Sequence, residues 1–307
     1  MTKQKVCIIG DGLTGLVTAT VLSKLNLEID LVTTNTVKKN LKSIRTLAVS
    51  QKNLEFLKKL KINNTLDGKF WPCDLMKLYT ANEKTKYSEI FEINRKKKQK
   101  KEILYMIENS ALINNFYKNI KKNKSIKYVA VKKIHSIINS GLLKSLKTNS
   151  KNKSQYNLIV ICKEDLSNLI KNKLFNQPYK EVAVTTILKH KSLPNNIARQ
   201  IFFGSEILAL LPISKTKTSI VWTVKKKIIK KNQDNKLFLK NKIKNYTKEF
   251  LPQIQFCSDI EFKDLSLSLR EKYFDDRVLL FGDILHKVHP LTGQGFNMTL
   301  RDLSSLE

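Results

Sequence analysis

Three glycines near the start of the chain have the spacing of a loop that binds dinucleotide phosphates. They form the pattern GxGxxG at Gly10, Gly12 and Gly15, between the apolar run Lys5–Ile9 and a segment with helical periodicity, Leu13–Leu25. The first glycine of such a loop permits a tight turn, the second lets the backbone approach a pyrophosphate, and the third lets helix and strand pack closely. The pattern predicts phosphate binding at the helix N-terminus, with a purely structural turn as the alternative.

The end of the second apolar run departs from this fingerprint. An acidic residue normally lies there, about 20 residues after the glycines, and binds ribose hydroxyls. Here the run Ile29–Val32 is followed by Thr33. A threonine makes one neutral hydrogen bond where a carboxylate would accept two. We expect either weaker binding of the nucleotide or a contact supplied by another group.

A second set of glycines and polar residues lies near the other end of the chain. The apolar run Val278–Phe281 leads into Gly282-Asp283, and Gly293-Gln294-Gly295 then opens a helical pattern. The strand would carry the Asp283 carboxylate to a sheet edge, where it could bind a polyol, and the free N–H groups of the helix could face an anion. His286 and His289 are spaced like metal ligands. With no third ligand nearby, a structural role is favoured and no metal site is predicted.

The elements around these residues predict an α/β fold. Strand, helix and strand within the first 33 residues form a βαβ unit, whose right-handed crossover implies a parallel sheet. Helices are expected over Leu47–Leu60, Ser110–Ile120, Lys236–Phe250 and, as a helix start, Gly295–Leu306. Further strands are expected over Leu75–Tyr79, Tyr87–Ile93, Tyr128–Val131, Leu142–Leu146 and Leu158–Cys162, with a hairpin turn at Ser140–Gly141. From Glu181 the longer β-like runs Val182–Leu188, Arg199–Phe203, Ile207–Pro212 and Ser219–Val224 predict a mostly antiparallel sheet.

Composition and charge narrow the classes of partner. The chain has 307 residues, about two domains as a prior, and 41% apolar residues, enough for a folded core. Lys and Arg number 57 against 26 Asp and Glu, which gives a net charge of +31. Only six of the basic residues are arginine, the residue preferred for reading phosphate and guanine, so a nucleic-acid partner is not favoured. The dispersed lysines indicate solvated faces, with an anionic membrane surface as the alternative.

Cysteines and hydropathy bear on the compartment. Cys7, Cys73, Cys162 and Cys257 lie far apart without a CxxC pair, so neither a disulfide framework nor a zinc site is predicted. No apolar run reaches the roughly 18 residues of a membrane span. A motif that begins by residue 10 leaves no room for a cleaved signal. We expect a cytoplasmic protein, with peripheral contact to the inner face of the membrane left open.

Taken together, the motifs resemble those of a known enzyme family. The GxGxxG loop, Arg45 in Arg45–Ser50, and the C-terminal residues from Gly282-Asp283 to Arg301-Asp302 resemble the FAD-dependent aromatic hydroxylases of the para-hydroxybenzoate hydroxylase fold. His289-Pro290 before Gly-Gln-Gly is most similar to the ubiquinone-biosynthesis ring hydroxylases. Weaker likeness at Glu108-Asn109, Gln177-Pro178-Tyr179, Leu208–Pro212 and Ser219–Trp222 extends the resemblance over nearly the whole chain.

This resemblance implies a domain organisation. A Rossmann-like FAD-binding domain with a parallel sheet would comprise residues 1–70, 97–178 and 268–307. A mostly antiparallel substrate-binding sheet domain would comprise residues 71–96 and 179–267, giving an α/β fold that is α+β overall. Because relatives continue with a further helical segment, we expect the C-terminal helical segment to be missing from this chain.

The resemblance also assigns cofactor-binding residues, with FAD as the cofactor. The pyrophosphate would lie against the first loop and turn, formed by Gly10, Gly12, Leu13, Thr14 and Gly15 with Arg45 nearby, and Thr33 would stand at the ribose position. Asp283 would bind the ribityl and phosphate region. The isoalloxazine would lie against Pro290, Gly293, Gln294 and Gly295, with Asn297 close by. No catalytic residue is named by this reasoning.

The implied activity is that of a flavoprotein monooxygenase. NAD(P)H would reduce the flavin, O2 would form a flavin C4a-hydroperoxide, and a polyprenylated phenol ring would be hydroxylated in ubiquinone biosynthesis. The helix that opens at Gly295 would stabilise the anionic reduced flavin. The polyprenyl phenol and O2 are therefore expected partners, together with an anionic membrane surface or a ubiquinone-biosynthesis complex.

Departures from the family pattern keep other functions open. Lys163-Glu164 stand where relatives carry an Asp-Gly motif associated with FAD and the nicotinamide cofactor, and Ile284 and Leu285 replace small residues after Gly-Asp. The alternatives are an FAD-dependent reductase or oxidase of the same fold and a non-catalytic, degenerate flavoprotein.

Overall fold

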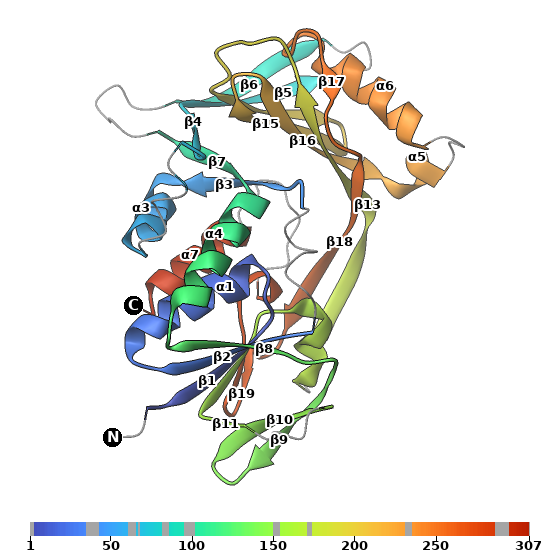
Figure 1. The fold of residues 1–307 in the computed structure, drawn as a ribbon. Coiled ribbons are helices and arrows are strands. Elements are labelled where there is room, and N and C mark those ends of the chain that lie inside the picture. The colour runs from blue at the N-terminus through green and yellow to red at the C-terminus, as the bar shows by residue number, and fades with distance from the viewer. Residues whose placement is uncertain are drawn as a thin grey trace.

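The computed structural model of the chain has a half built on a parallel sheet and a half built on a large, mostly antiparallel sheet (Figure 1). Two long strands, β13 (Leu174–Lys189) and β18 (Glu261–Arg270), pair with each other and run from one half to the other. The structure describes residues 3–34, 43–60, 66, 68–81, 86–94, 102–149, 154–170, 174–230, 235–285 and 295–306.

The first half is built on a six-stranded sheet in the order β19-β20-β12-β1-β2-β8. All neighbours are parallel except the short strand β19. The strands are β1 (Lys5–Ile9), β2 (Glu28–Thr33), β8 (Ile126–Ala130), β12 (Leu158–Ile161), β19 (Phe274–Asp275) and β20 (Val278–Leu280). Because parallel strands end at the same side of a sheet, the segments that follow β1, β2, β12 and β20 lie along one edge.

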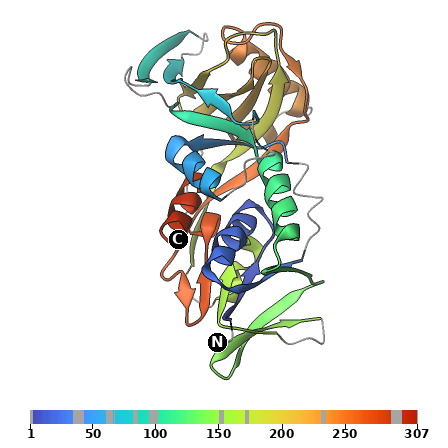
Figure 2. The ribbon, with the colours of Figure 1, turned by 60° about the vertical axis from the view of Figure 1, so that its left-hand side comes forward.

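Helices cover one face of this sheet and a small sheet covers the other. Helix α1 (Leu13–Leu22) is buried along nearly its whole length because it packs between the sheet, α4 (Asn109–Lys122) and α7 (Gly295–Ser304), as Figure 2 shows for α1 and α4. The opposite face packs against β9 (Ile134–Ser140), β10 (Leu143–Thr148) and β11 (Gln155–Tyr156). This half also contains the short helical turns η1 (Ser23–Leu25) and η3 (Glu164–Leu169).

The second half is an eight-stranded sheet in the order β17-β13-β16-β15-β14-β5-β6, with β18 paired to β13. Neighbours are antiparallel except β14 and β5. Helix α6 (Asn235–Thr247) covers one face, where Trp222, Leu239 and Ile243 are buried, and α5 (Lys226–Lys230) precedes it. The other strands are β5 (Leu75–Ala81), β6 (Tyr87–Asn94), β14 (Ile197–Phe203), β15 (Glu206–Ser214), β16 (Lys217–Lys225) and β17 (Gln255–Phe256).

A three-stranded sheet lies between the two halves. Its order is β3-β7-β4, and α3 (Gln51–Lys59) follows directly on β3. Strand β3 contacts α7 of the first half, while β4 and β7 contact β15 of the second half. The strands are β3 (Thr46–Ser50), β4 (Trp71–Cys73) and β7 (Leu104–Glu108).

The expected α/β class with a parallel and a mostly antiparallel sheet is confirmed, but two local predictions were wrong and a long strand was missed. The helix predicted over Leu47–Leu60 begins only at Gln51, because β3 pairs with β7 and the Ser50 hydroxyl then accepts a bond from Asn53 N at 3.4 Å. The turn at Ser140–Gly141 joins β10 to β9, which had not been predicted, rather than to β8. Strand β18 was also missed, although its alternating residues are typical of a strand.

Candidate functional site

The turn between β1 and α1 can be built only with glycine at its first and last positions. Gly10 has φ +118, in the region that favours glycine, and its N–H donates to Val32 O at 2.9 Å. A β-carbon on Gly15 would collide with the carbonyl oxygen of Gly10. The α1 helix therefore starts in direct contact with the end of β1, as the sequence pattern predicts.

Gly12 leaves room in front of the helix. Its φ of −70 and ψ of 175 are open to any residue, so its backbone conformation does not require glycine. A β-carbon built there would meet nothing within 4 Å. Leu13 and Thr14 follow in the first turn of α1, where N–H groups lack partners within the helix. This open cradle at a helix N-terminus fits the diphosphate of a dinucleotide.

The segment after β20 brings a carboxylate to the same place. Gly282, in the short helical turn η4 (Gly282–Ile284), has φ +81, and a β-carbon there would collide with the Thr14 side chain. Asp283 is exposed, and its Oδ1 lies 3.5 Å from where a β-carbon of Gly295 would be. Asp283 thus lies between the starts of α1 and α7, and its assignment to the ribityl and phosphate region stays a prediction.

Only some of the residues predicted to contact the isoalloxazine are among the residues that the structure describes. Pro290, Gly293 and Gln294 lie outside the described residues, as do His286 and His289. Gly295 begins α7.

Asn297, also predicted to lie near the isoalloxazine, is buried. Its side chain donates to Ala48 O at 2.6 Å and accepts from Ser50 N at 3.0 Å and from Asn53 Nδ2 at 2.7 Å. Asn297 therefore holds the first turn of α7 against β3 and α3.

A lysine crosses the edge of the sheet at the site of the expected Asp-Gly motif. Lys163 follows β12, and its Cβ lies 3.1 Å from where a β-carbon of Gly10 would be. Its Nζ donates to Thr34 Oγ1 at 2.8 Å and lies 3.8 Å from Asp165 Oδ2. A positive charge thus spans the ends of β12, β1 and β2. We call the assembly of Gly10–Gly15, Thr33, Lys163, Asp283 and Gly295 the cofactor edge.

The sequence reading missed one carboxylate within the cofactor edge. Asp11, between the first two glycines, is only 4% exposed, and its Oδ2 accepts a 2.7 Å hydrogen bond from Tyr128 Oη of β8. Burial and the neighbouring Asp11 hold the pKa of Tyr128 well above its ordinary value, while a hydrogen bond with Thr33 lowers it in part. The signal in the sequence was the carboxylate itself, between the first two glycines of the loop.

The cysteines of this region are inert thiols. Burial is the main cause that raises the pKa of Cys162 to about 12, with a further contribution from Asp283 and an opposing hydrogen bond with Thr18. A thiol with such a pKa is not a nucleophile at neutral pH. Within the described part of the chain, no group of His, Cys, Asp and Glu could hold a metal ion.

A cavity of about 480 Å³ lies between the large sheet and the β3–β7–β4 sheet. Side chains alternate along its floor: on β15, Ala209 lines the cavity whereas Leu208 and Leu210 are buried on the α6 side. Arg45, predicted to lie near the cofactor, is among the lining residues. The lining includes Ala48, Met76, Leu78, Ile93, Met106, Ala183, Thr185, Ala198, Gln200, Ala209, Leu211, Ser219 and Val221.

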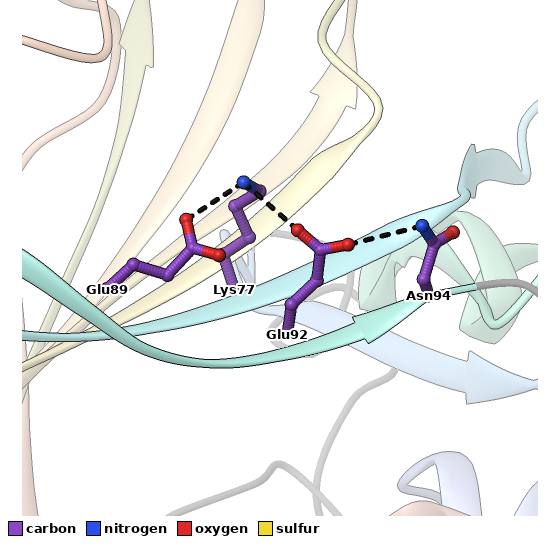
Figure 3. Close-up of polar contacts among 4 residues, drawn as sticks. All are labelled: Lys77, Glu89, Glu92 and Asn94. Carbon is purple, nitrogen blue, oxygen red and sulfur yellow. Dashed lines mark hydrogen bonds and ion pairs between the residues drawn. The ribbon is translucent and has the colours of Figure 1, made fainter.

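The two faces of the edge strand β6 differ in character. Ile93, which lines the cavity, and Phe91 are 40% and 58% exposed, so the apolar lining continues to the rim of the sheet. On β5 and β6, Lys77 Nζ contacts Glu89 Oε2 at 2.8 Å and Glu92 Oε2 at 3.1 Å, a network that Figure 3 shows. This pairing neutralises part of the acidic charge beside the rim.

Comparisons with known proteins agree with this arrangement. Residues 164–307 match the model of a family described as FAD binding domain. The chain is 27% identical over 171 residues to the mitochondrial ubiquinone biosynthesis monooxygenase COQ6 of Rattus norvegicus, a match that covers 41% of this chain and 34% of the relative. It is 26% identical over 145 residues to the ubiquinone hydroxylase UbiL of Rhodospirillum rubrum, covering 42% and 30%. The matches span about a third of these relatives' length.

Solved structures share the fold over nearly the whole chain. The p-nitrophenol 4-monooxygenase PnpA of Pseudomonas putida has a TM-score of 0.78 at 13% identity, covering 99% of this chain and 78% of its own. PqsL of Pseudomonas aeruginosa in complex with 2-aminobenzoylacetate has a TM-score of 0.79 at 13% identity, covering 99% and 85%. At such identities the likeness establishes the fold.

The described helices include none that is long and apolar enough to cross a membrane. The resemblance seen in the sequence is confirmed: residues 164–307 match a family described as FAD binding domain, curated relatives that the chain matches at low identity are named as a monooxygenase and a hydroxylase of ubiquinone, and the fold is shared with solved aromatic monooxygenases.

Proposed function

We propose that the protein is an FAD-dependent monooxygenase that hydroxylates a polyprenylated phenol in ubiquinone biosynthesis, with NAD(P)H and O2 as co-substrates. One observation carries the proposal: the apolar cavity and the cofactor edge meet at β3. Ala48 of β3 lines the cavity, and its carbonyl accepts the 2.6 Å hydrogen bond from Asn297 in the first turn of α7. A ring held in the cavity would therefore lie close to the end of α7 that borders the cofactor edge.

Each half would contribute a separate task. The first turn of α1 would bind the diphosphate, and Asp283 would accept hydrogen bonds from the cofactor's hydroxyl groups. The start of α7 would direct positive potential at negative charge that develops beside it. Bound FAD supplies the redox chemistry and the reaction with oxygen. The cavity would orient the ring and exclude water.

The cavity suits an apolar, ring-containing substrate. Small side chains on neighbouring strands, Ala183, Ala198 and Ala209, leave the space open, and most of the lining surface is apolar. The buried side chains of Gln200 and Ser219 lie among the lining residues and are candidates to contact a phenol hydroxyl. An attached apolar chain could leave over Ile93 and Phe91 at the rim.

A membrane surface is the proposed meeting place with such a substrate. Ile90, Phe91 and Ile93 are exposed on β6, and the sequence continues with Arg95 and Lys96–Lys98. Each basic residue near an anionic leaflet contributes about 1 kcal/mol of attraction. Sedimentation with vesicles should depend on anionic lipid, and binding that ignores lipid charge would remove this part of the proposal.

The first test is the visible absorption spectrum of the purified protein, followed by NADPH in air. Flavin bands that bleach with NADPH, and a product of a polyprenyl phenol heavier by one oxygen atom, are expected. A protein that cannot be reconstituted with FAD would overturn the proposal.

A second candidate rests on Lys163-Glu164, which replace the Asp-Gly of relatives and adjoin the nucleotide site. An FAD-dependent reductase or oxidase of the same fold would bleach with a reductant but give no hydroxylated product, and a degenerate flavoprotein would do neither. Incorporation of oxygen from labelled O2 into the product separates the monooxygenase from both.

A further inference from the structure

We infer that Asp11 supplies the carboxylate that binds the ribose hydroxyls of the adenosine half of the cofactor, a contact normally made from the end of β2. The inference rests on the proposed function for the identity of the ligand. It assigns a binding role to a residue inside the glycine-rich loop.

The position of Asp11 is the first argument. Thr33, where an acid is normally found, is buried at the end of β2 and offers only a hydroxyl. Tyr128 is hydrogen-bonded to both Thr33 and Asp11. The Tyr128 hydroxyl therefore links the carboxylate of Asp11 to the Thr33 side chain.

The rigidity of the arrangement is the second argument. Tyr128 lies opposite Leu31 in the register of β2 and β8, and its ring packs edge-on against Tyr117 of α4 at 5.8 Å between centroids. Its hydroxyl donates to Asp11 Oδ2 at 2.7 Å, a short charge-assisted bond. Since a carboxylate can accept about four hydrogen bonds, this bond can orient Asp11 while ligand hydroxyls bind the same group.

The direction of the carboxylate is the third argument. A negative charge that faced the start of α1 would repel a diphosphate bound there. The bond to Tyr128 instead draws Asp11 toward β2 and β8, which is the ribose side of such a site. If the bond served only to hold the loop against β8, no charge would be needed, because an asparagine at position 11 could accept the same hydrogen bond.

The chain offers a matched control for a purely structural role. Asp30 of β2 is also 4% exposed and accepts a 2.9 Å hydrogen bond from a tyrosine, Tyr156. Its other partner is Lys5 Nζ at 2.9 Å. Asp30 precedes the end of β2 by three residues. Asp30 and Tyr156 therefore repeat the tyrosine–carboxylate hydrogen bond of Tyr128 and Asp11 away from the cofactor edge.

The test compares the affinities for ADP and 2′-deoxy-ADP by titration calorimetry. The wild-type chain should bind ADP about tenfold or more tightly than the deoxy probe, as expected for one charge-assisted hydrogen bond. Asp11→Asn should weaken ADP binding by a similar factor and bring the ratio of the two affinities close to one. Asp30→Asn should leave that ratio at the wild-type value.

A rescue keeps the test decisive if Asp11 variants fold poorly. The double variant Asp11→Ala with Thr33→Glu returns a carboxylate to the end of β2 and should restore discrimination between the probes. A ratio that persists in Asp11→Asn, or that is one in the wild type, overturns the inference. If FAD binds and hydroxylation proceeds while Asp11→Asn keeps the ratio, this inference alone fails. If ADP is discriminated but FAD is not bound, only the proposed function fails. A wild-type chain that binds neither overturns both.

Discussion

The cofactor edge and the cavity are built in different ways. The cofactor edge depends on backbone positions that follow strand ends, such as Gly10, Gly15 and Gly282, where a β-carbon would be strained or would collide. The cavity depends on small side chains from strands that are distant in sequence, such as Ala48 and Ala209. The first site is therefore sensitive to changes in backbone geometry, and the second to changes in side-chain volume.

This difference predicts that the two regions can be damaged separately. Substitutions at the cofactor edge should change stability or nucleotide affinity, whereas substitutions in the cavity should change the use of the phenol. Any variant that changes both properties together would weaken the distinction.

Gly15→Ala should have the largest effect. Its β-carbon would collide with Gly10 O, so α1 must move away from the end of β1. We expect a loss of about 3 kcal/mol in the free energy of unfolding and little bound FAD. Urea denaturation and the flavin absorbance measure the two losses.

The control for Gly15→Ala is Gly12→Ala, which adds the same methyl group three residues earlier. Because nothing lies within 4 Å of that position, the variant should unfold as the wild type does. It should nevertheless bind FAD about tenfold more weakly, since the methyl group occupies the phosphate cradle. Equal loss of stability in both variants would contradict the account of this turn.

The sequence predicted much of the cofactor edge because its signals are local. GxGxxG between a strand and a helix fixes the turn at Gly10–Gly15, and Gly282-Asp283 after a strand places the carboxylate at the same edge. Asp11 was missed because its partner Tyr128 comes from a strand more than a hundred residues later. Only the folded sheet brings the two together.

Ala209→Leu should impair the use of the phenol while FAD stays bound. The added methylenes would fill the floor of the cavity, so we expect KM for the phenol to rise about tenfold. The flavin absorbance and the melting temperature should change little, because the space is open. Steady-state kinetics at saturating NADPH measure the effect.

A variant of the adjacent Leu210 distinguishes the effect of cavity volume from the effect of sheet stability. It is buried on the α6 side, so Leu210→Ala should lower the free energy of unfolding by about 2–5 kcal/mol and leave KM near the wild-type value. A rise in KM for this variant would show that the cavity is not bounded by one face of the sheet.

The sequence could not predict the cavity. Its lining comes from β3, β5, β6, β7, β13, β14, β15, β16 and β18, and two strands of that set, β7 and β18, had no prediction at all. The segment Leu47–Ser50 was predicted as the start of a helix, but it pairs with β7 and is part of a strand. Arg45 was assigned to the cofactor from its motif; it is among the residues that line the cavity, and the assignment stays a prediction.

Cys73 tests whether the buried cluster that it forms with the cavity residues Met106 and Ala198 is sealed from water. It lies on β4, 1% exposed, and burial raises its pKa from 9.0 to about 12. Between these values the native state keeps a proton that the unfolded state releases, so the free energy of unfolding falls as pH rises. From pH 8 to 10 the wild type should lose about 1.4 kcal/mol more than Cys73→Ala.

Urea denaturation at both pH values measures the effect of Cys73. The control is Cys257→Ala, because Cys257 is exposed. From pH 8 to 10 this variant should lose as much free energy of unfolding as the wild type. If the wild type and Cys73→Ala lose the same free energy of unfolding between pH 8 and pH 10, water reaches the thiol.

Lys163→Gln should have the smallest effect and refines the account of the cofactor edge. The ammonium group spans the strand ends through its 2.8 Å bond to Thr34 and is partly exposed, so solvent weakens its attraction for a diphosphate. We expect FAD affinity to fall about threefold at low salt and the difference to shrink at high salt, because exposed charges are screened. Lys144→Gln, which removes a charge that is paired with Asp276 away from the edge, should change neither value. A gain of affinity in Lys163→Gln would mean instead that the lysine obstructs the position where relatives carry Asp-Gly, and the cofactor edge would then bind its nucleotide despite this residue.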